Sequence, residues 1–147
     1  MKTFSVRFLS TLVCAALLCI PLYVIAESDL SNTISIAQDM SMSVNDRILA
    51  IRTLGASGDA SASGPLLDIL GNLSETGAIR SSAVRALANL GTPRAEILQA
   101  FEKVYRDPLT GNNLSYTVLL YLGYMQATES LPLLSEALSH SNSMIRF

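Results

Sequence analysis

The residues that could carry out chemistry in this chain are few, and they lie far apart in the sequence. A nucleophilic triad needs a buried histidine that a carboxylate orients, but the single histidine, His140, lies in a Ser-His-Ser-Asn stretch of small polar residues. Asp68 and Glu75 could serve as an acid–base pair, yet the sequence predicts no apolar pocket around them. We therefore expect His140 to be a solvated turn residue, and we expect no catalytic residues.

Metal and cofactor sites also lack their usual ligands. Both cysteines, Cys14 and Cys19, lie in an apolar N-terminal segment, and the acidic residues are scattered singly along the chain. The glycines have neither the spacing nor the lysine of a phosphate-binding loop. We expect no metal site and no cofactor.

The N-terminal segment, residues 1–26, has the features of a signal peptide. Lys2 and Arg7 precede an uncharged, mostly apolar run that ends at Ala26, where small residues favour cleavage. The alternative is an uncleaved membrane anchor, because the run is close to the length that spans a bilayer. We expect export to the periplasm or the medium, or anchoring at the inner membrane if the segment is retained.

Cleavage after Ala26 would leave 8 basic against 12 acidic residues and a net charge of −4, since Lys2 and Arg7 are the only charged residues removed. No basic patch remains that would bind nucleic acid. Contact with a membrane is expected only if the segment is not cleaved.

From residue 44 onward, apolar residues recur three and four positions apart, which predicts an all-α fold. Residues 27–43 are predicted to be a short capping helix or, alternatively, a flexible leader. Glycines and prolines divide the rest into three predicted helix pairs: 46–57 with 65–73, 78–90 with 93–105, and 114–125 with 131–138.

The three pairs resemble one another in sequence, with a repeat length of about 34 residues. Leu54-Gly55 recurs as Leu122-Gly123, and the triplet 65–67 (Pro-Leu-Leu) recurs at 132–134. Three residues of the first predicted helix recur 33 positions later, so that Arg47, Ala50 and Leu54 correspond to Arg80, Ala83 and Leu87.

The pattern Arg-x-x-Ala-x-x-x-Leu, a glycine turn and then Pro-Leu-Leu resembles bacterial HEAT-like repeats, including the phycobilisome-lyase type. The resemblance covers residues 44–147, divided into 44–74, 77–107, 112–142 and the start of a further repeat at 143–147. It implies a short right-handed α-solenoid of about three helical hairpins. Ser115 stands where the other repeats have arginine, so a ladder of arginines and turn acids, common in this family, would be broken there.

The apolar stripes predict which residues are buried. In the third pair, the core positions of the second helix are expected to be Leu131, Leu134 and Leu138. Arg80, by contrast, falls outside the stripe of its helix and is expected to meet water.

The resemblance and the lack of reactive groups together favour a non-catalytic scaffold that binds another protein. The partner is expected along the solenoid face or at the open C-terminal end. Alternatives are an accessory or chaperone-like relative of HEAT-like lyases and a truncated fragment of a longer repeat protein. The candidate partner-binding residues are Arg52, Arg85, Lys103, Tyr116, Tyr121 and Tyr124.

Overall fold

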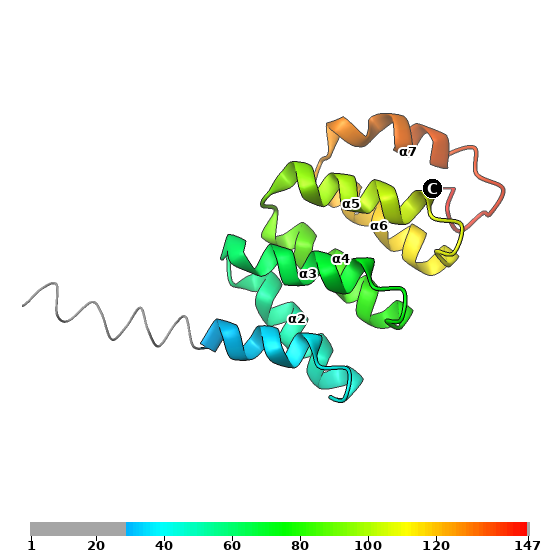
Figure 1. Ribbon diagram of the computed structural model, residues 1–147. Helices are drawn as coiled ribbons and strands as arrows, with labels where there is room; N and C mark the ends of the chain where they lie inside the picture. The colour runs from blue at the N-terminus through cyan, green and yellow to red at the C-terminus, as the bar shows by residue number, and fades with distance from the viewer. Residues whose placement is uncertain (1–28, 147) are drawn as a thin grey trace, which may run out of the picture. The chain divides into compact units, whose positions relative to one another are not determined.

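The computed structural model describes residues 29–146, and within this range the chain forms helices joined by turns, without strands (Figure 1). This confirms the predicted all-α class for the described residues. The predicted signal peptide lies outside them. Residues 29–38 are helical. The helices that follow are α2 (Val44–Ala56), α3 (Ser63–Gly71), α4 (Gly77–Leu90), α5 (Arg94–Arg106), α6 (Asn112–Tyr124) and α7 (Leu131–Ala137), with single 3-10 turns at Ala60–Ala62 and Thr128–Ser130.

Side-chain caps and glycine turns set where these helices begin and end. The hydroxyl of Ser43 accepts a hydrogen bond from the backbone N–H of Asp46 at the start of α2, and Thr76 caps α4 in the same way. Gly91 ends α4 with a positive φ of 70°, a conformation that glycine adopts without strain. The helices begin and end within about two residues of the predicted positions, because the apolar spacing, glycines and prolines on which the prediction rests are local in the sequence.

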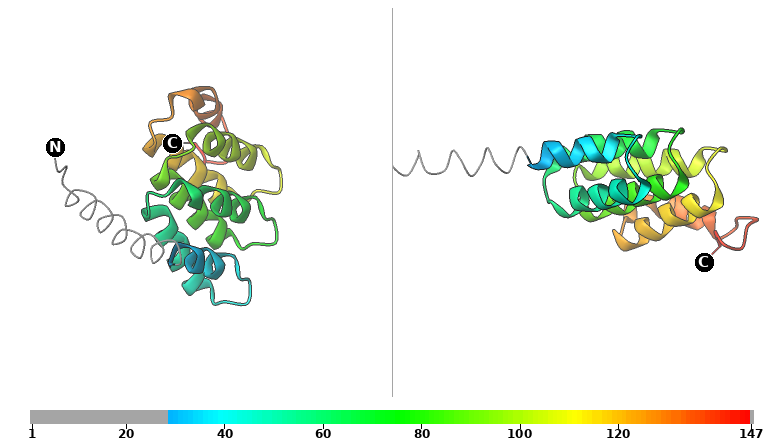
Figure 2. Two further views of the ribbon diagram at one scale, coloured as in Figure 1. Left: turned by 60° about the vertical axis from the view of Figure 1, so that its left-hand side comes forward. Right: turned by 90° about the horizontal axis from the view of Figure 1, so that it is seen from below.

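Within the compact unit Thr33–Phe147, α2 packs on α4, α4 packs on α6, and α3 packs on α5. We call α2, α4 and α6 the first helices and α3, α5 and α7 the second helices. The first helices α2, α4 and α6 follow one another in one layer, and α3 and α5 lie in a second layer (Figure 2). The core lies between the layers and includes Leu54, Leu87, Phe101 and Leu122.

Gly55 is a point of close contact between α2 and α4. A Cβ atom at this position would lie 2.5 Å from the Cα of Ala86, so no larger residue fits without moving a helix. In α6, Gly123 has open space around the corresponding position.

The predicted burial of the third pair is wrong in its second helix. Leu131 and Leu138 are 59% and 58% exposed, whereas Leu133 and Ala137 are buried. Leu133 and Ala137 are four residues apart and share the face of α7 that meets the core. Within residues 29–146, no further helix covers the face that carries Leu131 and Leu138, so these two side chains remain largely in solvent, whereas Leu134 is half-buried.

Among the residues that the structure describes, no helix has both the length and the apolar character needed to cross a bilayer.

Candidate functional site

Four turns, three that precede the first helices and one that follows α7, share one hydrogen-bonding pattern. In each turn, one side chain accepts a hydrogen bond from the backbone N–H two residues later, at 2.8 to 3.0 Å. In the first turn, the hydroxyl and the backbone N–H of Ser41 donate to the carboxyl group of Asp39 and hold its pKa below its usual value. The accepting residues are Asp39, Asn72, Asp107 and His140.

The turns therefore align the repeats residue by residue. Their accepting residues are 33, 35 and 33 positions apart. The positions eight residues after the first three are Arg47, Arg80 and Ser115. This alignment places Ser115 where an arginine stands in the two preceding repeats, as the sequence predicted.

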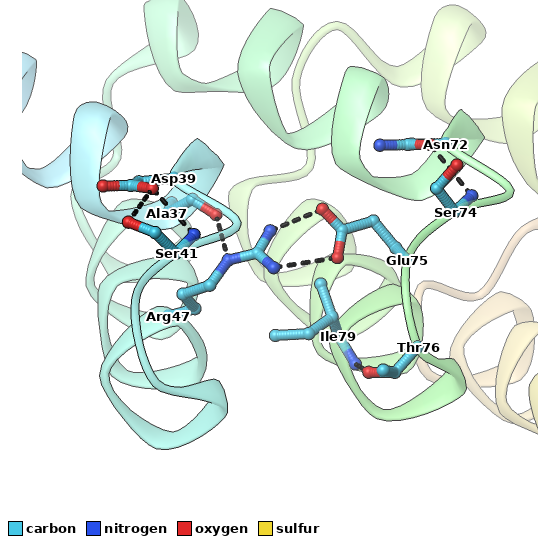
Figure 3. Close-up of polar contacts among 9 residues, drawn as sticks. All are labelled: Ala37, Asp39, Ser41, Arg47, Asn72, Ser74, Glu75, Thr76 and Ile79. Atoms are coloured by element: carbon cyan, nitrogen blue, oxygen red, sulfur yellow. Dashed lines mark hydrogen bonds and ion pairs between the residues drawn. The ribbon is translucent and has the colours of Figure 1, made fainter.

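Arg47 joins three parts of the chain at the first repeat (Figure 3). Its Nε donates to the carbonyl oxygen of Ala37 at 3.0 Å, and its two terminal nitrogens donate to the two carboxylate oxygens of Glu75. The side chains of Arg47 and Glu75 are only 5% and 4% exposed. In such a bidentate pair, each carboxylate oxygen accepts a hydrogen bond from the guanidinium group, so both buried charges are paired. The pair favours the one arrangement of the helices in which these bonds form.

Arg80 occupies the same position in the second repeat but lacks the acid. Its Nε donates to the carbonyl oxygen of Leu70 at 2.9 Å, as Arg47 does to Ala37. Thr110 stands where Glu75 stands, three residues after the start of its turn, and no carboxylate within residues 29–146 pairs with Arg80. The prediction that Arg80 meets water is wrong: it is 7% exposed, because its side chain lies against the end of α3.

Three of the predicted partner-binding residues come together on the first helices. The guanidinium carbon of Arg85, on α4, lies 5.9 Å from the ring centroid of Tyr121, on α6, in a cation–π contact. The rings of Tyr121 and Tyr124 meet edge to face, with centroids 6.0 Å apart. Arg85 is exposed and Tyr124 is 69% exposed, so this Arg85–Tyr121–Tyr124 cluster is accessible from solvent.

The other predicted residues lie elsewhere. Arg52 is exposed on α2, Tyr116 is half-buried on α6, and Lys103 is exposed on α5 in the second layer. Lys103 therefore does not share a helix layer with the Arg85–Tyr121–Tyr124 cluster.

Two ion pairs tie α5 to the last hairpin. Arg94 contacts both carboxylate oxygens of Glu129, at 3.0 and 3.2 Å, and Arg106 bonds to Glu136 on α7 at 3.2 Å. The hydrogen bonds from Arg94, followed by the backbone N–H of Glu129 itself, lower the pKa of Glu129 from 4.5 to about 2. Both pairs are exposed, so each contributes little to the stability of the fold.

Glu75, Asp68 and His140, the side chains considered for catalysis, do not come together in one site. Glu75 is held by Arg47, Asp68 is exposed on α3, and the Nδ1 atom of His140 accepts a hydrogen bond within its own turn. No cluster of three or more potential metal ligands occurs among residues 29–146.

The Arg47–Glu75 pair was not identified from the sequence. The acid lies 28 residues from its arginine, and helix periodicity does not connect the two. Alignment of the turns, instead of the helices, would have placed both residues at fixed distances from Asp39 and Asn72.

Comparison with protein families identifies the repeat. Residues 79–101 match the model of the PBS lyase HEAT-like repeat. The matched segment contains most of α4, the turn at Gly91 and the first part of α5. The comparison with curated proteins found no match. The resemblance to HEAT-like repeat proteins is therefore confirmed.

Proposed function

Because residues 79–101 carry a HEAT-like repeat, we propose that this chain is a non-catalytic scaffold whose stacked hairpins, a short right-handed solenoid, hold another protein. Repeats of this type generally bind proteins along the surface that stacking creates. The proposal gives the chain a role that depends on shape and surface chemistry.

The observation that carries the proposal is the Arg85–Tyr121–Tyr124 cluster. Tyrosine and arginine are the residue types most enriched at the centres of protein interfaces, since they offer large contact area together with hydrogen-bonding groups. Here they are contributed by two adjacent repeats, α4 and α6, so the surface exists only when the hairpins stack.

The contact with Tyr121 also restricts the long side chain of Arg85 before any partner arrives. A side chain that is already ordered loses less conformational entropy on binding. Tyr124, with more than two thirds of its surface exposed, would then supply most of the area that a partner buries.

Affinity capture of the tagged chain from its native cells tests the proposal. The variant with Arg85→Ala, Tyr121→Ala and Tyr124→Ala should lose the proteins that the unchanged chain retains. Glu96→Ala is the matched control, because it removes an exposed charge from α5, in the other layer. Equal recovery of the same proteins by the triple variant, with its helical circular dichroism intact, would contradict the proposal.

We also propose that the scaffold acts outside the cytoplasm, from the signal-like composition of residues 1–26. Mass spectrometry of the chain purified from its native cells should find an N-terminus at Glu27. A retained Lys2 would show that the segment is not removed.

A further inference from the structure

The third repeat contains a polar cavity of about 600 Å³ where α5, α6 and α7 approach one another. It extends from the end of α5 across the following turn to the start of α6, and from there to the last turn. Its polar lining includes Tyr105, Asp107, Thr110, Ser115, Glu136 and His140.

The cavity lies at the position in the third repeat that an arginine side chain occupies in each of the two preceding repeats. Arg47 and Arg80 each lie eight residues after the accepting residue of their turn, which is Asp39 or Asn72. The Nε of each arginine donates to the carbonyl oxygen of the residue two positions before that turn residue, Ala37 or Leu70. In the third repeat these two positions are Ser115 and Tyr105, and both line the cavity. Because serine is short, the volume of an arginine side chain is left open.

The groups around the cavity suit a guanidinium cation. Its lining holds two carboxylates, Asp107 and Glu136, against one guanidinium, that of Arg106. Arg106 donates to Glu102 at 2.9 Å and to Glu136 at 3.2 Å, so among the described residues Asp107 is the lining carboxylate that stands outside an ion pair. Negative lining charge favours the entry of a cation with several N–H donors.

A hydrogen-bond acceptor is also left over at this site. The hydroxyl oxygen of Thr110 is buried and has no hydrogen-bond partner among the residues that the structure describes. Buried polar atoms are normally paired. Thr110 lies at the position that Glu75 occupies one repeat earlier, and because it also lines this cavity, its hydroxyl can accept a hydrogen bond from a group that enters. Burial and the nearby Glu136 carboxylate raise the pKa of Tyr105, which keeps its phenol neutral at this rim.

From the occupied positions of Arg47 and Arg80, the vacant one at Ser115 and the orphan hydroxyl of Thr110, we propose that this cavity binds the guanidinium group of an arginine that a second protein presents. The incoming group takes the place that the first two repeats fill from within the chain. This inference rests on the proposed function only for the origin of the arginine. The cavity itself is separate from the Arg85–Tyr121–Tyr124 cluster.

Titration of the isotope-labelled full chain with N-acetyl-arginine methylamide tests the site by NMR. Backbone amide signals of residues 105–115 and 136–145 should shift and saturate, with a dissociation constant in the millimolar range, about 1–10 mM, as a single polar group provides. The citrulline analogue, which has the same length but no charge, should not saturate. No saturable shift at these residues, or an equal response to citrulline, would overturn the proposal.

Ser115→Arg provides the internal version of the ligand. This variant should fill the cavity from within, raise Tm and abolish the response to the arginine compound. Asn89→Arg, which adds the same charge at an exposed position on α4, should change neither Tm nor the response to the arginine compound. A full response of Ser115→Arg to the ligand would contradict the assignment of the cavity.

If Ser115→Arg does not fold, Glu136→Gln gives the same information. Glu136 is exposed, and its loss should weaken binding of the arginine compound several-fold, whereas Lys103→Gln should not. Unchanged binding by Glu136→Gln would count against the site.

The origin of the arginine is tested separately. Free arginine carries an α-ammonium and an α-carboxylate whose charges cancel, so it should gain nothing over the blocked compound at a site that recognises the guanidinium group alone. Tighter binding of free arginine would overturn the protein origin. The variant lacking the Arg85–Tyr121–Tyr124 cluster should bind the blocked compound normally, so failure of the scaffold proposal and failure of this site would be distinguished.

Discussion

At Arg47, a guanidinium lies almost completely out of water and depends on one carboxylate, that of Glu75. Removal of that charge leaves a buried cation without its counter-ion. We expect Glu75→Gln to lower the free energy of unfolding by about 3–5 kcal/mol. Urea unfolding followed by circular dichroism measures the change.

The control for this prediction is Glu129→Gln, which breaks the exposed pair with Arg94. Solvent screens such a pair, so this variant should change the unfolding midpoint little. If both variants lower the midpoint equally, the Arg47–Glu75 pair has no special role in the fold.

The carboxyl of Glu129 should titrate unusually low. Its pKa in the folded chain is about 2, against 4.5 unperturbed, because Arg94 donates to its ionised form. A lowered folded-state pKa stabilises the fold above pH 4.5, and this contribution is lost as the pH falls from 4.5 toward 2. NMR titration of the Glu129 side chain measures the value directly, and Arg94→Ala should return it toward 4.5. A Glu129 pKa near 4.5 in the unchanged chain would show that the pair does not form in solution.

At the scale of the helices, the contact between α2 and α4 depends on the absence of a side chain at Gly55. A methyl group there meets the backbone of Ala86 as well as its side chain, so neither helix can relieve the contact without moving. We expect Gly55→Ala to destabilise the chain by about 1–3 kcal/mol, measured from the shift in thermal unfolding.

Gly123→Ala is the matched comparison on α6. The added methyl group meets open space, and alanine favours the helix over glycine. This variant should gain up to about 0.5–1 kcal/mol. Stabilisation by both substitutions would mean that α2 and α4 do not pack as closely as described.

The helices could be predicted closely because their signals are local. The glycines and prolines that divide the predicted helices, such as Gly91 and Pro93, mark helix ends within a few residues of sequence. Local helical spacing also connects Ile79, Ala83, Leu87 and Leu90 on one face of α4, and all four are buried.

Features that depend on the neighbouring repeat were harder to predict. Arg80 is buried by the end of α3, and periodicity within α4 contains no information about that contact. In α7, the stripe at Leu131, Leu134 and Leu138 and the positions Leu133 and Ala137 are both helical patterns, and tertiary packing alone decides between them.

For the molecule as a whole, the predicted partner-binding residues divide between the two layers. Arg85, Tyr121 and Tyr124 gather because stacking brings α4 beside α6, whereas Lys103 lies on the second helices. Sequence alone could name residue types suited to an interface, but not which repeats would combine them. The cavity beside Ser115 likewise appears only when three helices and two turns are assembled.

The most direct test of the scaffold account is photo-crosslinking in the native cells, with a photoreactive phenylalanine analogue in place of Tyr124. We predict a discrete crosslinked product that contains a second protein and disappears when Arg85→Ala is added. The same analogue at Glu102, exposed on α5, should give no such product. Absence of any product from position 124, or the same product from both positions, would contradict the claim that this surface holds a partner.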